Sequence, residues 1–286
     1  MKLSIGIIGL PNAGKSTLFK ELTKRNVPIA SYPFTTIDPN HGVVAAKDER
    51  LDKLAQIFHS KEVFPAALEF VDIAGLVRGA HKGEGLGNQF LSHIREVDAV
   101  IHLIRAFEDS GVTHVESTID PKRDFEIVQE ELRQKDAQAK EKENLLSTKP
   151  QLIILNGSVE EIPRSSASSS AWFRDSLVFD LKAGLNDDDV KKIFQEILKL
   201  LDLITFFTCN ENEARSWFVR KNTLVQKAAG VIHTDFEQKF IKAEVINWQK
   251  ITQVGGWNQA KNKGLIRLEG KDYLVQEGDL VLIKHS

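Results

Sequence analysis

The feature that most constrains this chain is a phosphate-binding pattern at residues 9–16. These residues read Gly-Leu-Pro-Asn-Ala-Gly-Lys-Ser, which fits G-x-x-x-x-G-K-[S/T]. The apolar residues 3–8 before it predict a buried parallel strand, and residues 17–23 after it have the spacing of a helix. A strand, a glycine turn and a helix start aim successive backbone N–H groups at one point, where the helix dipole adds positive charge. The pattern therefore predicts a site for the phosphates of a nucleotide.

Two side chains of this pattern have a defined chemistry. We expect Lys15 to reach the outer phosphates and Ser16 to hold Mg²⁺. The stretch 26–40 that follows the predicted helix contains three prolines, which is typical of a loop. In nucleotide hydrolases, a threonine on this loop completes the Mg²⁺ shell and senses the γ-phosphate. We assign that role to Thr36, with Thr35 as the alternative.

A further strand, predicted over residues 67–72, ends in the sequence Asp72-Ile-Ala-Gly75. Asp72 can hold a Mg²⁺-bound water, and Gly75 can turn its N–H toward the γ-phosphate. Leu76 follows at the position where Ras-like enzymes have a glutamine that orients the attacking water. Leucine cannot polarise water, so the catalytic help must come from another group, or turnover is slow.

The stretch 77–88 predicts a second mobile switch, because it contains four glycines. His81 in this stretch could orient water or a phosphate oxygen, and a solvated loop histidine is the alternative. His102 lies in the apolar run 98–106 and is interpreted as a core histidine with satisfied hydrogen bonds. Histidines and cysteines nowhere show metal-ligand spacing, so Mg²⁺ is the metal that we expect.

Length and composition restrict the class of protein. The 286 residues suit two domains, and the single Cys209 excludes a disulfide framework and favours a reducing, cytosolic setting. The net charge of −2 argues against a surface that attracts nucleic acid throughout. No apolar stretch reaches the length of a membrane span. We therefore expect a cytoplasmic protein without a membrane partner.

The pattern of predicted elements changes near residue 204. Before it, strands over 98–106, 151–156 and 177–180 alternate with helices, and a helix over 187–203 closes the first part. After it come short strands and one helix near 224–229. The short strands are predicted at residues 205–208, 241–246, 265–268, 272–275 and 280–283. This small α+β unit has no catalytic cluster, which favours an interaction module.

The residues after the strand 151–156 bear on the choice of nucleobase. Guanine-specific hydrolases have N-K-x-D here, and the aspartate accepts hydrogen bonds from guanine. This chain has Asn156-Gly-Ser-Val159-Glu160 instead. The lysine is missing, Val159 cannot accept a hydrogen bond, and Glu160 is displaced by one residue. Selectivity for guanine is therefore lost, and adenine becomes admissible.

Several motifs resemble those of the YchF subfamily, the Obg-like ATPases within the Obg branch of P-loop NTPases. They lie at residues 9–16, 32–36, 72–77, 83–88, 229–236, 270–273 and 278–279. The resemblance covers nearly the whole chain. It implies an α/β G domain with a doubly wound, mostly parallel sheet over residues 1–202. It also implies a small α+β domain of the β-grasp (TGS) type over residues 203–286.

The resemblance also implies Mg²⁺-dependent ATP hydrolysis, with GTP often accepted, and association with ribosomes. Ser16 and Thr36 would bind Mg²⁺ by position. The residues that would line the phosphates or meet the base are Asn12, Ala13, Gly14, Lys15, Ser16, Thr17, Asn156, Gly157 and Ser158. Related enzymes with an apolar residue at the position of Leu76 use a potassium ion, held partly by the asparagine that corresponds to Asn12. Such an ion could supply the charge that an arginine finger supplies elsewhere.

The chain departs from the family pattern in two places. The family has a long coiled-coil hairpin inside the G domain, but residues 124–149 leave room for only one helix, a short remnant of it. The family's base loop is N-x-x-E, with a glutamate where this chain has Val159. Either Glu160 compensates after a shift of one residue, or the backbone alone contacts the base.

The leading hypothesis is a slow, cytosolic, Mg²⁺-dependent NTPase that favours ATP and acts as a monomeric switch. Its second domain would dock on a ribosome or ribosomal subunit, and no DNA specificity is expected. A nucleotide-sensing module with negligible hydrolysis is the alternative, motivated by Leu76. A third hypothesis is an RNA-binding protein with a local basic patch. That patch would comprise Arg215, Arg220, Lys221 and Lys227.

Overall fold

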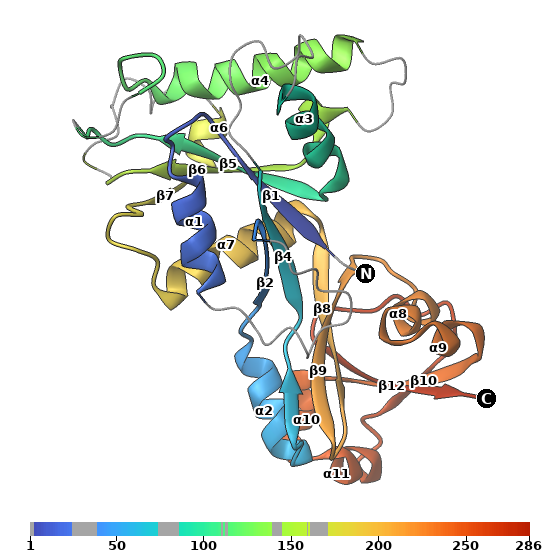
Figure 1. The fold of residues 1–286 in the computed structure, drawn as a ribbon. Coiled ribbons are helices and arrows are strands. Elements are labelled where there is room, and N and C mark those ends of the chain that lie inside the picture. Colours follow the sequence, from blue (N-terminus) through green and yellow to red (C-terminus); the bar gives the residue numbers. More distant parts are fainter. Residues whose placement is uncertain are drawn as a thin grey trace. The chain divides into compact units, whose positions relative to one another are not determined.

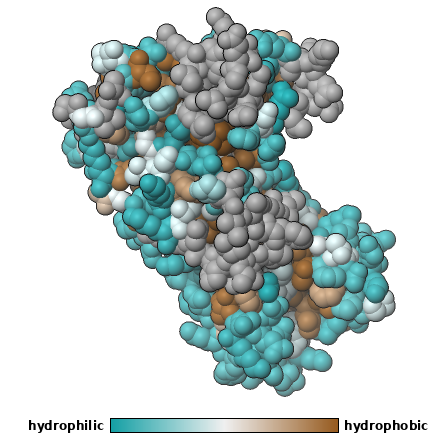
Figure 2. All heavy atoms as spheres, in the orientation of Figure 1, coloured by the Kyte–Doolittle hydropathy of each residue, from teal (hydrophilic) through white to brown (hydrophobic). Residues whose placement is uncertain are grey.

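The computed structural model describes residues 3–24, 39–73, 86–109, 111, 114–138, 145–158, 160 and 171–286. The chain forms two compact units (Figure 1). The first comprises residues 2–44 and 68–200, and the second comprises residues 45–67 and 201–286. No helix in the described ranges is long and apolar enough to cross a membrane. On the face shown in Figure 2, hydrophilic residues cover most of the described surface, and hydrophobic residues gather in separate patches.

The first unit is built on a six-stranded sheet in the order β2-β4-β1-β5-β6-β7. In that order the strands are His41–Ala45, Ala67–Asp72, Ser4–Ile8, Ala99–Arg105, Gln151–Asn156 and Leu177–Phe179. Strand β1 pairs in parallel with β4 and β5, and β6 pairs in parallel with β5 and β7. Strands β4 and β2 lie on one side of β1, and β5, β6 and β7 lie on the other side. This is the topology of a doubly wound sheet. The predicted α/β fold of this unit is confirmed.

Helices cover both faces of this sheet (Figure 1). Helices α3 (Leu86–Glu96) and α4 (Pro121–Gln138) share one apolar cluster with β1, β4 and β5. Helices α1 (Lys15–Thr23) and α7 (Asp187–Leu200) lie on the other side of the sheet. Helix α7 begins with a reciprocal cap, in which the Asn186 side chain accepts from the N–H of Asp189 and the Asp189 side chain accepts from the N–H of Asn186. A short helix, α6 (Ala171–Arg174), precedes β7.

The central strand β5 is buried at all seven positions, as expected for a parallel strand covered on both faces. His102 in this strand is 1% exposed and stacks on Phe125, with ring centres 5.4 Å apart. Burial lowers the pKa of His102 to about 3, so the ring is neutral. Among the residues that the structure describes, its Nδ1 has no hydrogen-bond partner. The prediction of a core residue agrees with this placement, but the expected full satisfaction of its hydrogen bonds was wrong.

The stretch predicted as a short helical remnant folds as α4 and a 3₁₀ turn, η3, at Leu146–Thr148. The carboxylate of Asp136 in α4 accepts hydrogen bonds of 2.8 Å from the N–H groups of Leu146 and Ser147. These bonds hold the η3 turn against helix α4. Within the described part of residues 121–149, α4 is therefore the only long helix.

The second unit contains a mixed sheet in the order β11-β10-β12-β8-β9-β3. In that order the strands are Arg267–Glu269, Phe240–Asn247, Asp279–His285, Leu203–Cys209, Glu213–Arg220 and Glu62–Phe64. Strand β12 pairs in parallel with β8, and β3 pairs in parallel with β9. The other pairs are antiparallel. Residues 272–275, predicted as a strand, instead form a turn with a single bridge between Leu274 and Leu224.

Two apolar clusters cover the two faces of this second sheet. Neighbouring residues of β8 point to opposite faces, and Phe206 lies in one cluster while Phe207 lies in the other. Helix α8 (Val225–Ile232) packs in the cluster of Phe206, and α9 (Thr234–Gln238) follows it along the chain. The cluster of Phe207 includes α2 (Glu49–Phe58), α10 (Trp248–Val254) and α11 (Trp257–Asn262).

The segment 45–67 belongs to the second unit, although the predicted boundary at 202–203 places it in the first. Helix α2 buries Leu51 and Leu54 in the cluster of Phe207, and β3 extends the sheet by pairing Glu62 with Glu213. Ser216 Oγ also accepts a 2.7 Å hydrogen bond from the N–H of Ala66. These contacts bridge about 150 positions of sequence, so local patterns do not reveal them.

Candidate nucleotide-binding site

The loop between β1 and α1 has a backbone conformation that favours glycine or asparagine at three positions. Gly9, Asn12 and Gly14 have positive φ angles of 149°, 63° and 101°. A Cβ atom on Gly9 would lie 2.2 Å from the carbonyl oxygen of Leu103, and one on Gly14 would lie 2.5 Å from Nδ2 of Asn156. Both pattern glycines are therefore required by backbone conformation and by close packing.

Lys15 is the first residue of α1 and is only 8% exposed. Its Nζ donates a 3.0 Å hydrogen bond to the carbonyl oxygen of Leu10, so the side chain folds back over the loop. Burial lowers the pKa of Lys15 to about 8, and the negative charge of Asp72 partly offsets this effect. A buried amine with a single neutral acceptor is poorly compensated, and an anionic phosphate beside it would stabilise its charge.

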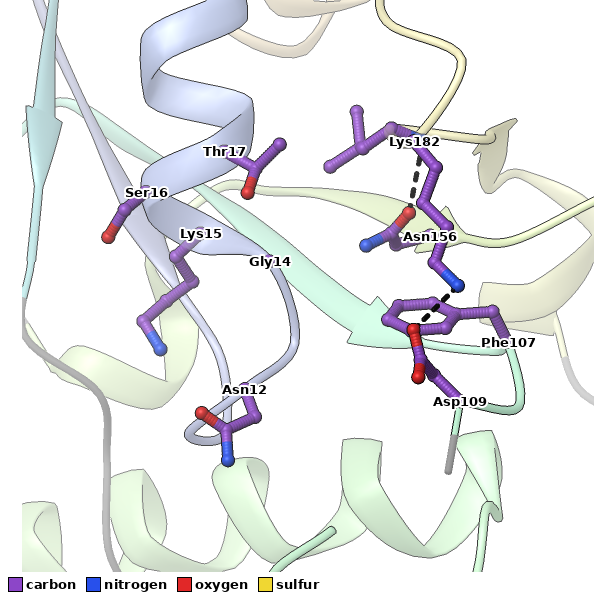
Figure 3. Close-up of a pocket in the computed structure, with 10 residues that line it drawn as sticks. Asn12, Gly14, Lys15, Ser16, Thr17, Phe107, Asp109, Asn156 and Lys182 are labelled. Atoms are coloured by element: carbon purple, nitrogen blue, oxygen red, sulfur yellow. Dashed lines mark hydrogen bonds and ion pairs between the residues drawn. The ribbon is translucent and has the colours of Figure 1, made fainter. Parts of the chain in front are cut away.

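A cleft of about 390 Å³ opens beside this loop (Figure 3). Its phosphate end is formed by the loop and the first turn of α1, and its other end by the last residue of β6 and by residues that follow β5 and β7. The lining residues are Asn12, Gly14, Lys15, Ser16, Thr17, Phe107, Asp109, Asn156, Leu181 and Lys182. The carboxyl ends of parallel strands are the usual position of ligand sites in such sheets. The predicted residues 12 and 14–17 are thus brought together in one cleft.

Asn156, at the end of β6, joins three segments at the floor of this cleft. Its Nδ2 donates to the carbonyl oxygen of Ala13 at 2.9 Å, and its Oδ1 accepts from the N–H of Leu181 at 3.2 Å. Its backbone oxygen accepts from the N–H of Ala106 at 2.8 Å. The residue is 4% exposed, so these bonds are shielded from water. Asn156 clamps the phosphate loop to the segments at the other end.

The other predicted nucleotide-binding residues, Ala13, Gly157 and Ser158, are not among the residues that line the cleft. Ala13 is buried, and its carbonyl oxygen is held by Asn156. Gly157 donates its N–H to the carbonyl oxygen of Phe179 at 3.0 Å, and a Cβ on it would lie 3.0 Å from the carbonyl carbon of Ala106.

The sequence analysis missed four residues at the base end of the cleft, which are Phe107, Asp109, Leu181 and Lys182. Lys182 Nζ lies 2.8 Å from a carboxylate oxygen of Asp109 and 4.8 Å from the centre of the Phe107 ring (Figure 3). The hydrogen bond from Lys182 is the main reason why the pKa of Asp109 is lowered. Their position just after two predicted strands was the one available signal, because strand ends meet at a ligand site in parallel sheets.

Arg105, the last residue of β5, holds Phe107 in place. Its guanidinium carbon lies 4.5 Å from the centre of the Phe107 ring, and its Nε donates to the carbonyl oxygen of Phe107 at 3.1 Å. Arg105 Nη2 also donates to the carbonyl oxygen of Asp109 at 3.3 Å. The segment that presents Phe107 and Asp109 to the cleft is therefore fixed by one buried arginine.

The donor set for a metal is only partly within the described residues. Ser16 exposes its hydroxyl in the first turn of α1, and that hydroxyl has no partner in the described part of the chain. Asp72 ends β4, and its charge raises the pKa of nearby Lys15. These oxygen donors suit Mg²⁺, which also takes phosphate and water oxygens. Among the described residues no group of three His, Cys, Asp or Glu side chains could hold a metal.

Several predicted residues lie outside the residues that the structure describes. They are Thr35, Thr36, Gly75, Leu76, His81 and Val159.

Two family models match the chain. One, described as 50S ribosome-binding GTPase, matches residues 4–157. The other is the YchF-GTPase_C model, described as a protein of unknown function, and it matches residues 203–286.

Relatives match over nearly the full chain. "Ribosome-binding ATPase YchF" of Bacillus subtilis is 36% identical over 360 positions, which cover 98% of this chain and 98% of the relative. "Obg-like ATPase 1" of Oryza sativa subsp. japonica is 37% identical over 363 positions, which cover 99% of this chain and 92% of the relative. The solved structure of the Schizosaccharomyces pombe YchF GTPase superposes with a TM-score of 0.80 at 30% identity and covers 99% and 98% of the two chains.

The relatives contain residues that this chain lacks. The alignment with the Bacillus protein runs over 360 positions, whereas this chain has 286 residues. Many aligned positions therefore have no counterpart here. In this chain, the described part of residues 121–149 contains a single long helix.

Proposed function

Because the chain belongs to the YchF family of Obg-like ATPases, we propose that it is a Mg²⁺-dependent hydrolase of nucleoside triphosphates. ATP is its preferred substrate, GTP is also accepted, and the protein acts as a ribosome-associated switch. The observation that carries this proposal is the loop at residues 9–14 with the buried amine of Lys15 beside an open cleft. The relatives named ribosome-binding ATPases support the choice of substrate and partner.

The phosphates would bind at the start of α1. The first N–H groups of a helix have no partner within the helix, and the helix dipole favours negative charge beside them. Lys15 Nζ would leave the carbonyl oxygen of Leu10 for the outer phosphates, exchanging one neutral acceptor for an anionic one. Gly75 would add its N–H to the γ-phosphate.

Magnesium would supply charge neutralisation between the β- and γ-phosphates when bound. Ser16 and Thr36 would be its protein ligands, and Asp72 would hold one of its waters. Asn12 in the phosphate loop is the proposed contact to a potassium ion. His81 is the proposed group for orienting the attacking water, because Leu76 cannot do so.

The base would bind at the other end of the cleft, against Phe107. Lys182 now covers that ring, so a stacked base must displace it and separate it from Asp109. The freed carboxylate of Asp109 could then accept a hydrogen bond from an exocyclic amino group. Adenine and guanine both have such a group, so this contact would allow both ATP and GTP. The proposed preference for ATP rests on the relatives that are named ATPases.

The direct test is phosphate release from ATP and GTP by the full chain, with and without Mg²⁺ and K⁺, alongside titration with non-hydrolysable analogues. We expect turnover that requires Mg²⁺ and a tighter fit for the adenine analogue. Absence of nucleotide binding would contradict the proposal. Equal affinities would restrict it to an unselective NTPase.

A nucleotide-sensing module with negligible hydrolysis is the second candidate, and Leu76 is the observation that favours it. Single-turnover rates with and without ribosomes separate the two candidates. Binding without measurable turnover under both conditions would favour the sensing module.

The proposed setting is the cytoplasm, with the protein as a monomer. The second unit is proposed to be a TGS domain that docks on the ribosome. Cosedimentation of the full chain with ribosomal subunits in the presence of each nucleotide tests this partner.

A further inference from the structure

The second unit has a pocket of its own, of about 310 Å³, which is the lower end of the range for small-ligand sites. The end of β10, helix α10, the turn after α11 and the turn before β12 form its walls. Its polar lining consists of Asn247, Lys250, Arg267, Gln276 and Asp279. Ile246 and Leu265 provide apolar surface between them. Nothing in the proposed hydrolysis uses this pocket.

Uncompensated positive charge gathers beside the pocket. Lys250 is exposed and has no ion-pair partner in the described part of the chain. The same holds for Lys261 and Lys263, which are close in sequence to the lining residue Gly264. A ligand with several negative charges would therefore be attracted to this rim.

The basic patch suggested by the sequence, at residues 215, 220, 221 and 227, differs because some of its cations form ion pairs within the protein. Arg215 pairs with Glu213 at 2.9 Å, and Lys227 pairs with Glu237. Two of its four cations are thus already neutralised within the protein. Arg220 and Lys221 have no ion-pair partner in the described part of the chain, so this patch keeps two unpaired cations, whereas three unpaired lysines lie at or near the pocket in sequence.

Arg267 forms a rigid flat wall of the pocket. Its guanidinium carbon lies 5.2 Å from the centre of the Tyr273 ring, and its Nη2 donates to the Tyr273 hydroxyl at 2.7 Å. Its Nε lies 3.3 Å from a carboxylate oxygen of Glu269. The guanidinium plane is therefore held from two sides, although the side chain is 52% exposed. Guanidinium planes held in this way are stacking surfaces for unpaired bases.

The amide side chains of the pocket leave one donor and one acceptor available. Asn247 Oδ1 accepts from the N–H of Gln249 at 2.9 Å, which leaves its NH₂ group as a donor. Gln276 Nε2 donates to the carbonyl oxygen of Leu274 at 2.7 Å, which leaves its Oε1 as an acceptor. A nucleobase edge presents both donors and acceptors, so it can form hydrogen bonds with groups of both kinds.

Asp279 is a buried lining residue of the pocket, and its carboxylate is a hydrogen-bond acceptor. Its Oδ2 accepts from the Tyr273 hydroxyl at 2.7 Å and from the N–H of Gln276 at 2.9 Å. Its Oδ1 lies 3.8 Å from Arg267 Nη2, beyond hydrogen-bond distance. A carboxylate in this position can accept a hydrogen bond from the amino group of a nucleobase.

We infer that this pocket binds one unpaired nucleotide of a single-stranded RNA. The base stacks on Arg267 and is contacted at its edge by Asn247 and Gln276. Lys250 meets its phosphate, and Lys261 and Lys263 meet neighbouring phosphates of the strand. The inference deepens the proposed ribosome association, on which it rests for the source of the RNA. It does not depend on nucleotide hydrolysis.

The test uses the full chain and a fluorescent single-stranded RNA of about 12 nucleotides, followed by anisotropy at several salt concentrations. Lys250→Glu should weaken binding about tenfold and reduce the salt slope by about one. Asn247→Asp keeps the cap of α10 but removes the free NH₂ group, and it should weaken binding severalfold. Lys221→Glu makes the same charge change at an exposed lysine outside the pocket and should have little effect.

Three outcomes would overturn the inference. One is an equal loss in Lys250→Glu and Lys221→Glu, or no loss in both pocket variants. Another is displacement of the RNA by polyglutamate as readily as by unlabelled RNA, which would indicate an acidic peptide. The third is displacement by AMP or UMP as readily as by RNA, which would indicate a free nucleotide. ATP turnover and ribosome cosedimentation of the same variants are measured in parallel, so a failure of the proposed function is seen separately.

Discussion

The phosphate end and the base end of the cleft are held together in different ways. At the phosphate end, the loop is fixed by its own backbone, with positive φ angles at Gly9 and Gly14 and no room for a Cβ atom. At the base end, side chains from separate strand ends meet through a ring contact and an ion pair between Lys182 and Asp109. Asn156 is bonded to both ends.

This difference separates two properties of a nucleotide site. A backbone cradle binds any polyphosphate, because phosphates are common to all nucleotides. At the base end, substitution of side chains can change which base is preferred, and the backbone loop that binds the phosphates is not disturbed. Changes at the phosphate end should therefore reduce catalysis, whereas changes at the base end should alter affinity and selectivity.

The largest effect is expected from Lys15→Ala, which removes the buried amine beside the phosphate loop. We expect ATP turnover to fall about a thousandfold, or about 4 kcal/mol of transition-state stabilisation, because charge on the transferred phosphoryl group loses its partner. Lys20→Ala on the same helix is the control, since Lys20 is exposed and does not line the cleft. Phosphate release at saturating ATP measures both. Unchanged turnover in Lys15→Ala would exclude the proposed site of hydrolysis.

The next effect concerns the residue that joins the two ends. Asn156→Ala leaves the carbonyl oxygen of Ala13 and the N–H of Leu181 buried without partners, and we expect a loss of about 3 kcal/mol in the free energy of unfolding. Urea unfolding of the nucleotide-free protein measures it. Asn186→Ala removes only the exposed cap of α7 and should cost about 1 kcal/mol. If both variants lose the same free energy of unfolding, the hydrogen bonds of Asn156 contribute no more to stability than an exposed helix cap.

The sequence predicted the phosphate end because its residues are contiguous. A strand, a glycine pattern and a helix occupy residues 3–23, and local sterics decide the conformation of such a short segment. The base end could not be predicted in the same way. Phe107 and Lys182 are 75 positions apart in the sequence, and only the pairing of β5, β6 and β7 brings them together.

The same limit applies to the boundary between the two units. Helix α2 has apolar residues on one face, but this spacing does not reveal the sheet against which that face packs. Strand β3 has only three residues, two of them exposed, so it has almost no pattern of its own. Its assignment to the second sheet follows from pairing with β9, which local periodicity does not encode.

A change at the base end should spare catalysis. Phe107→Ala removes the stacking surface, and we expect the affinity for ATP and GTP analogues to fall about thirtyfold, within the range of one base–aromatic stack. Turnover at saturating ATP should change little, because the phosphate end is intact. Phe107→Tyr keeps the ring and is the control. Calorimetric titration measures the affinities, and a fall in turnover without a change in affinity would contradict the separation of the two ends.

The smallest effect tests the electrostatics of the phosphate end by pH. Lys15 has a pKa of about 8 in the nucleotide-free protein, and bound phosphates must raise it. Binding then takes up a proton above pH 8, so affinity for a non-hydrolysable ATP analogue should fall about tenfold between pH 7.5 and pH 9. Lys15→Arg stays charged over this range and should flatten the profile. Titrations at each pH measure it, and a profile that is equally steep in both proteins would assign the titration to another group.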